Sequence, residues 1–175
     1  MDASERLKKN SRRLRKLFLI LLVLIPIFDA IFWMGVGGGE DSYKRSLPVV
    51  ISGELPIMAT TLGFLVSIIP TGVVMYTLLL IARLFGLYEK GKIFDQENVE
   101  CFRAIGWSII ACDIADLFAN MALGPILSHY MPGGGDPPLN ISLDFYVLLA
   151  GFSVLTIAWV MEEARKIKDE QDLFV

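Results

Sequence analysis

The sequence predicts an all-α membrane protein with four transmembrane helices and both termini in the cytoplasm. Three observations predict this fold class. The mean hydropathy is +0.57, the apolar residues form four long blocks, and lysine and arginine are distributed unevenly between the connecting segments. Of the 175 residues, 54% are hydrophobic, more than the about 45–50% of a soluble domain. The length suits one domain, residues 1–175.

Each apolar block is long enough to cross a bilayer as a helix, which takes ~17–25 residues. None contains lysine or arginine. Strands of a membrane barrel are about 9–11 residues long with alternating polarity, which the blocks lack. The first block follows a basic segment, as in a secretory signal, but it is long for that role and no A-x-A-like site follows, so we interpret it as an uncleaved span. The predicted spans are 17–34, 57–82, 104–127 and 143–161.

The 16 lysine and arginine residues predict the orientation. Seven precede the first span, four flank the 83–103 segment and three follow the last span. Only Lys44 and Arg45 lie in the 35–56 loop, and the 128–142 loop has none. Basic residues accumulate on the cytoplasmic side of a membrane, so we expect both termini there. The expected location is the bacterial inner (cytoplasmic) membrane, with several crossings.

Three polar residues interrupt the third span, within "GWSIIACDIADLFANMALGPIL". Asp113, Asp116 and Asn120 recur at helical spacing and so lie within about 60° of arc. Asp29 lies about 18 Å into the first span, and Asp116 lies equally deep in the third. We expect Asp113 and Asp116 to face the bundle interior, with Asp116 near Asp29. A charged aspartate at mid-bilayer costs at least ~2.5–3.5 kcal/mol, so these side chains need a partner or a proton.

Three interpretations of this polar cluster remain open. In the first, the acids are protonated and join the helices by hydrogen bonds. In the second, they line a water-filled pocket and bind a cation or a proton; in the third, they pair with a group on another membrane subunit. The candidate hydrogen-bonding partners in the first interpretation are Asn120, Thr60, Ser67, Thr71, Tyr146 and Ser153.

The segment between the second and third spans, "LYEKGKIFDQENVECFRAIGWSII", resembles the loop of a bacterial membrane-protein family known as domain of unknown function 2975. That family has a Gly-x-Ile-Phe turn, here at 91–94, followed by a helix entering the third span. The C-terminal "EEARKIKDEQDLFV" is similar to the family's ending, although the family usually has Thr in place of Phe174. The resemblance implies a four-helix inner-membrane protein and no established reaction. Some members resemble partners of small helix-turn-helix regulators.

The turn and the tail form a candidate cytoplasmic partner face. An exposed apolar terminus lowers solubility unless it docks, so we expect the tail to pack near the turn. The candidate residues of this face are Gly91, Ile93, Phe94, Leu173, Phe174 and Val175.

The remaining residues carry little recognisable chemistry. His129 is the only histidine, so a bis-histidine haem or a conventional zinc site is excluded. Cys101 and Cys112 form no C-x-x-C motif, and no phosphate-binding loop or nucleophile elbow is present. We therefore expect no cofactor, no metal and no enzymatic activity. The three tryptophans near span ends are interpreted as interfacial anchors: Trp33, Trp107 and Trp159.

These features favour a small accessory or sensor subunit that acts through another membrane or cytoplasmic protein. The alternative is a small-ion or proton-coupled transporter that works as a homo-oligomer. The partners expected are the lipid bilayer and a second protein or a second copy, with no direct contact to nucleic acid.

Overall fold

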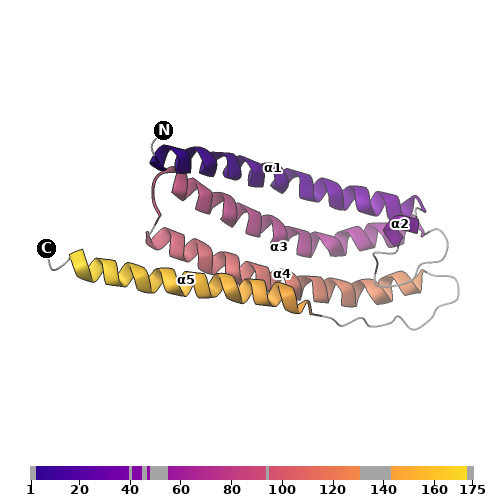
Figure 1. Cartoon of the computed structure of the whole chain (residues 1–175). Helices are drawn as coiled ribbons and strands as arrows, with labels where there is room; N and C mark the ends of the chain where they lie inside the picture. Colours follow the sequence, from indigo (N-terminus) through magenta and orange to yellow (C-terminus); the bar gives the residue numbers. More distant parts are fainter. Residues whose placement is uncertain are drawn as a thin grey trace. The chain divides into compact units, whose positions relative to one another are not determined.

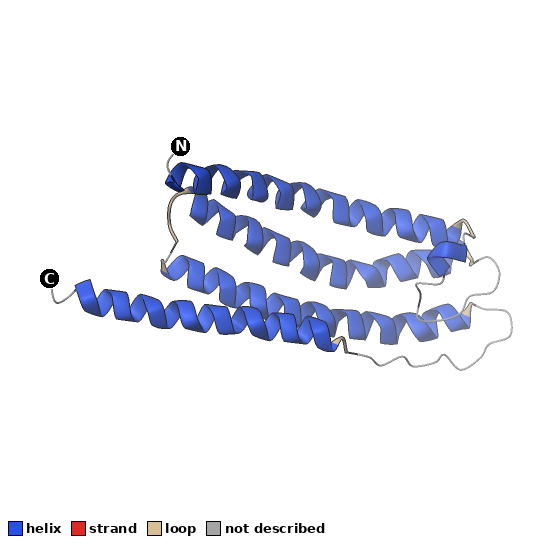
Figure 2. Ribbon diagram, in the orientation of Figure 1, coloured by secondary structure: helices blue, strands red, loops and turns tan. Residues whose placement is uncertain are grey.

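Four long helices and one short helix make up most of the part of the chain that the structure describes (Figure 1). A computed structural model describes residues 3–39, 41–44, 47, 55–93, 95–130 and 143–172. Within these ranges every regular element is helical and there is no strand (Figure 2). The helices are α1 Ala3–Gly37, α2 Asp41–Lys44, α3 Ile57–Glu89, α4 Gln96–His129 and α5 Phe145–Asp172.

The four long helices extend beyond the predicted spans. All four are long and apolar enough to cross a membrane, which confirms the predicted all-α fold with four candidate transmembrane helices. The cytoplasmic location of both termini stays a prediction. In α1 the helix begins at Ala3, fourteen residues before the apolar block, because lysine, arginine, leucine and glutamate are good helix formers in water as well. Apolar content marks only the part of a helix that lies in lipid. At the other end of the chain Asp144 caps α5, because its Oδ1 accepts the backbone N–H of Tyr146 at 2.9 Å.

The chain divides into two compact units, and both contain segments of α1, α3 and α4. The single-domain organisation expected from chain length therefore stays a prediction. Unit 1 comprises Met1–Leu22, Val74–Ala111 and Asp144–Val175, and unit 2 comprises Val23–Val73 and Cys112–Leu143.

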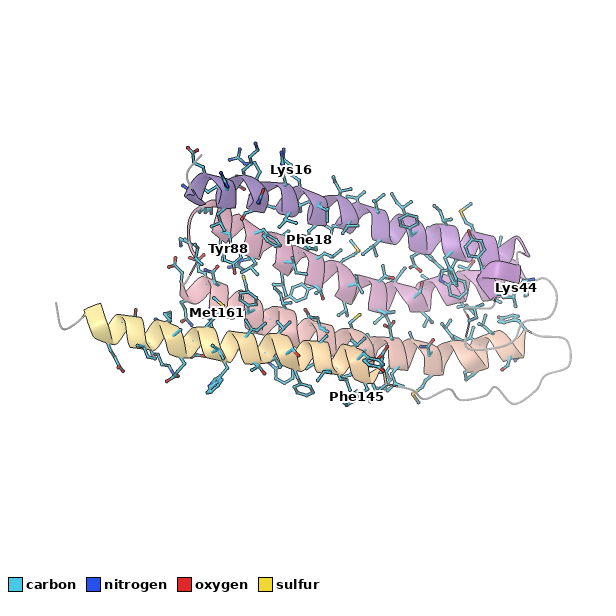
Figure 3. All side chains as sticks on the ribbon, viewed as in Figure 1. Lys16, Phe18, Lys44, Tyr88, Phe145 and Met161 are labelled. Atoms are coloured by element: carbon cyan, nitrogen blue, oxygen red, sulfur yellow. The ribbon has the colours of Figure 1, made fainter. Side chains whose placement is uncertain are left out.

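Unit 1 contains the first half of α1, the second half of α3, the first half of α4 and all of α5. Phe18 of α1 stacks on Phe85 of α3 with ring centroids 5.7 Å apart, while Lys16 lies on the opposite face of α1 (Figure 3). The beginning of α1 and the end of α5 lie at the same end of this unit (Figure 1), as an even number of spans requires. Its buried core comprises Leu80, Leu84, Leu87, Cys101 and Ile105.

Glycines bring α4 and α5 together in unit 1. A Cβ atom on Gly106 would lie 2.7 Å from the Leu155 side chain and 3.1 Å from the carbonyl oxygen of Gly151. A Cβ atom on Gly151 would lie 2.6 Å from Ile110. Small residues at both sides of the crossing let the two backbones approach, as is common between membrane helices.

Unit 2 joins the second half of α1 and the first half of α3 to the second half of α4. Val36 of α1 and Leu127 of α4 are both fully buried, so all three helices contribute to one core. The buried residues of this core are Trp33, Val36, Leu55, Ala59, Leu123 and Leu127.

Candidate intramembrane site

A ladder of polar and small side chains joins α1 to α3 in unit 2. Asp29, Trp33 and Gly37 are four residues apart and so lie on one face of α1. The two helices are antiparallel. Successive residues of α1 on this face therefore contact successively earlier residues of α3. Asp29 contacts Ser67 and Thr71, Trp33 contacts Gly63 and Ser67, and Gly37 lies against Thr60. The contacts define an antiparallel register between the two helices.

Ser67 is the centre of this ladder. Its hydroxyl accepts a hydrogen bond from Trp33 Nε1 at 2.9 Å. It also lies 3.0 Å from Asp29 Oδ2 and 2.8 Å from the Phe64 carbonyl oxygen. A hydroxyl has a single hydrogen, so only one of these two acceptors receives it fully at a time. Thr71 Oγ1 donates to the same Asp29 oxygen at 3.2 Å, and Asp29 therefore has hydroxyl donors from two successive turns of α3.

Trp33 is buried between helices, whereas the sequence led us to expect an interfacial anchor; its depth in the membrane stays a prediction. Its side chain is 5% exposed and its ring occupies the space that a side chain at position 63 would fill. A buried indole N–H needs an acceptor, and Ser67 supplies it. Trp107 and Trp159 are 59% and 65% exposed, which fits contact with lipid or its interface.

The polar residues of α4 differ in exposure. Asp113 is 6% exposed, whereas Asp116 and Asn120 are exposed. Sequence reasoning placed both acids toward the interior. At 100° per residue, Asp116 and Asn120 do lie within about 60° of Asp113, but the described residues leave both of them exposed. Asp29 accepts its hydrogen bonds from hydroxyl groups of α3. Its expected position near Asp116 stays a prediction.

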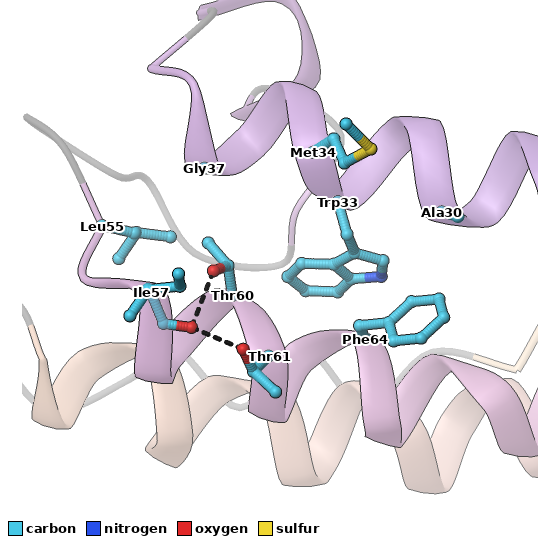
Figure 4. Close-up of a pocket in the computed structure, with 9 residues that line it drawn as sticks. All are labelled: Ala30, Trp33, Met34, Gly37, Leu55, Ile57, Thr60, Thr61 and Phe64. Atoms are coloured by element: carbon cyan, nitrogen blue, oxygen red, sulfur yellow. Dashed lines mark hydrogen bonds between the residues drawn. The ribbon is translucent and has the colours of Figure 1, made fainter.

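A cavity of about 550 Å³ lies beside the ladder, between the end of α1 and the beginning of α3 (Figure 4). The hydroxyls of Thr60 and Thr61 point to one acceptor, the carbonyl oxygen of Ile57, at 2.9 and 2.7 Å. With both hydroxyls donating within their own helix, the cavity offers mainly apolar surface. Its lining residues are Ala30, Trp33, Met34, Gly37, Leu55, Ile57, Thr60, Thr61 and Phe64.

The turn between α3 and α4 is held by polar contacts that the sequence did not indicate. Gly91 has φ +81°, a left-handed conformation that favours glycine. Asn98 is fully buried and its Nδ2 donates to the Lys92 carbonyl oxygen at 3.0 Å. The Lys92 ammonium lies 2.9 Å from Glu97, and this hydrogen bond raises the pKa of Lys92.

The partner face expected from the sequence is described only in part. Gly91 and Ile93 are exposed at this turn. Phe94, Leu173, Phe174 and Val175 lie outside the described residues, so the docking of the tail stays a prediction. Among the described residues, no three histidine, cysteine or acidic side chains gather as metal ligands would.

The fold and this site define a class of protein: an all-helical, multi-pass membrane protein with polar residues where two of its spans contact each other. The family model described as "Protein of unknown function (DUF2975)" matches residues 26–175. The chain belongs to this family, as its loop and tail predicted. No curated protein and no solved structure matches the chain.

Proposed function

We propose that the chain is an accessory or regulatory subunit of the bacterial inner membrane that acts through a second membrane protein and catalyses no reaction itself. The observation that carries this proposal is the exposed pair Asp116 and Asn120 in the apolar part of α4. An aspartate facing hydrocarbon costs several kcal/mol. A polar surface on another subunit would offset that cost.

The position of the pair on α4 supports a protein rather than a lipid neighbour. Asn120 lies about 20° and Asp116 about 60° from the buried Asp113. Leu127, about 40° from Asp113 by the same rule, is fully buried. Residues on this side of α4 are thus suited to packing, and at Asp116 and Asn120 the described chain leaves the face uncovered.

The alternative is a proton- or ion-coupled transporter assembled from several copies. The observation that favours it is the position of the two aspartates of α4. Asp113 and Asp116 lie about one helical turn apart, and Asp113 is buried whereas Asp116 is exposed. Carboxylates in such succession form proton relays in membrane proteins.

A photo-crosslinking residue at position 120 tests the proposal in intact cells. Phe118 is the matched control, because it is 64% exposed and lies about 3 Å along the helix but about 160° around it. We expect position 120 to give one discrete adduct with a second protein and position 118 to give no adduct with a protein. An adduct with another copy of the chain would favour the transporter. Adducts with lipid alone at both positions would refute both.

A further inference from the structure

A second cavity, in unit 1, has a basic lining. It encloses about 460 Å³ between α1, α3 and the beginning of α4. Three cations line it, Arg15, Arg83 and Lys90, with one carboxylate, Glu97. This cavity lies apart in sequence from the intramembrane polar residues and plays no part in the function proposed above.

The positive charges that line the cavity outnumber its one carboxylate, Glu97. The hydrogen bond from Lys92 lowers the pKa of Glu97, and the charges of Arg83 and Lys90 lower it further. No carboxylate of the described chain lies within 4 Å of Arg83 or Lys90, and Arg15 is 3.5 Å from Glu89 Oε2. Glu89 binds Arg12 more closely, at 2.7 Å. Glu97 is hydrogen-bonded outside the cavity, to Lys92 at 2.9 Å. Three positive charges and one negative charge leave a net positive lining, which attracts an anion.

The guanidinium of Arg15 is positioned as part of the cavity wall. A Cβ atom on Gly86 would meet its Cζ, Nε and Nη1 atoms at 3.7 Å each, so the planar group lies against the backbone of α3. The planar guanidinium carries its N–H groups in a fork that matches two phosphate oxygens.

The lining changes from basic to apolar along the helices. On α3, Leu79 precedes Arg83 by four residues, or about 6 Å. On α1, Leu19 follows Arg15 by the same distance, and because α1 and α3 run in opposite directions, both leucines lie on the same side of the cations. Both leucines line the cavity. A bound molecule thus meets charge at one end and apolar surface at the other.

We propose that this cavity binds one anionic phospholipid. Arg15 and Arg83 hydrogen-bond to its phosphate, Lys90 adds a point charge, and the first part of an acyl chain lies along Leu19 and Leu79. Basic cavities between membrane helices recognise phospholipid head groups in this way. The apolar end of the cavity favours a lipid over free inorganic phosphate, which would use the charge alone.

Native mass spectrometry of the full chain in detergent, titrated with phosphatidylglycerol or phosphatidylcholine, tests the proposal. We expect one phosphatidylglycerol to bind at least tenfold more tightly than phosphatidylcholine. Arg15→Gln and Arg83→Gln should each weaken that binding about fivefold, as expected for one charge near an anionic head group. Glu97→Gln should strengthen it, because it removes the one carboxylate of the cavity.

Arg13→Gln is the matched control, since Arg13 is exposed on α1 and does not line the cavity. Circular dichroism and elution volume should be the same for every variant. The proposal is overturned if the two lipids bind equally, if Arg13→Gln weakens binding as much as Arg83→Gln, or if inorganic phosphate displaces the bound phosphatidylglycerol at equal concentration.

Discussion

Ser67 determines how α1 and α3 fit together at the level of single side chains. It receives the indole N–H of Trp33 and faces the carboxylate of Asp29. Each of these groups is costly in hydrocarbon without a partner, and each finds one on the facing helix. In the sequence Asp29 stands out as an acid within a span, whereas Ser67 and Trp33 are both compatible with an ordinary apolar span.

Ser67→Ala should lower the free energy of unfolding by about 1 kcal/mol, because it removes the acceptor of Trp33 and one of the donors to Asp29. Ser153→Ala is the control, since the Ser153 hydroxyl donates only to Leu149 of its own helix. Unfolding in mixed micelles with increasing dodecyl sulfate measures both. Equal stability of the two variants would show that the ladder contributes nothing beyond helix packing.

At the scale of elements, the helices meet through small residues in both units. Trp33 fits over Gly63 in unit 2, and Gly106 and Gly151 face each other in unit 1. Without a hydrophobic driving force in lipid, such close packing is a principal source of attraction between helices.

Gly106→Ala should destabilise the protein by roughly 1–3 kcal/mol, as overpacking of a tight contact does. The added methyl group would meet Leu155 and the backbone oxygen of Gly151, and a backbone atom cannot move aside easily. Gly72→Ala is the control, because nothing lies within 4 Å of its new Cβ atom and alanine favours a helix. We expect thermal unfolding to separate the two variants. A Gly106→Ala variant as stable as Gly72→Ala would contradict the close crossing.

At the scale of the whole molecule, the beginning of α1 and the end of α5 lie at the same end of unit 1 (Figure 1). Fourteen of the 16 basic residues lie before the first span, in the 83–103 segment or after the last span. We predict that both termini are cytoplasmic, because basic segments are retained on that side. A C-terminal alkaline phosphatase fusion, active only after export, should be inactive, while a fusion within the 35–56 loop should be active. An active C-terminal fusion together with an inactive loop fusion would show that the topology is the opposite of the one predicted.

The sequence predicted the four spans well, because lipid imposes a minimum apolar length. It also identified Asp29, Ser67 and Thr71 as polar residues within spans. Ser67 and Thr71 were among the candidate hydrogen-bonding partners of the intramembrane acids, but the sequence could not select them for Asp29, since that choice depends on the register between α1 and α3. The burial of Trp33 was missed because a tryptophan near a span end is ordinarily interfacial. The convergence of Arg15, Arg83 and Lys90 was missed because counting charges assigns a side of the membrane and not a helix face.

The proposed function depends most directly on whether another protein covers Asp116. The test is the protein mass of particles released from bacterial membranes by a polymer that retains native lipids. We predict a mass larger than that of the 19.5 kDa chain by one defined second protein. Asp116→Asn, which keeps the shape and hydrogen bonding of a carboxyl group, should retain that component, and Asp116→Leu should lose it while the chain itself stays folded. A wild-type particle that holds a single copy of this chain alone, unchanged by Asp116→Leu, would contradict the account.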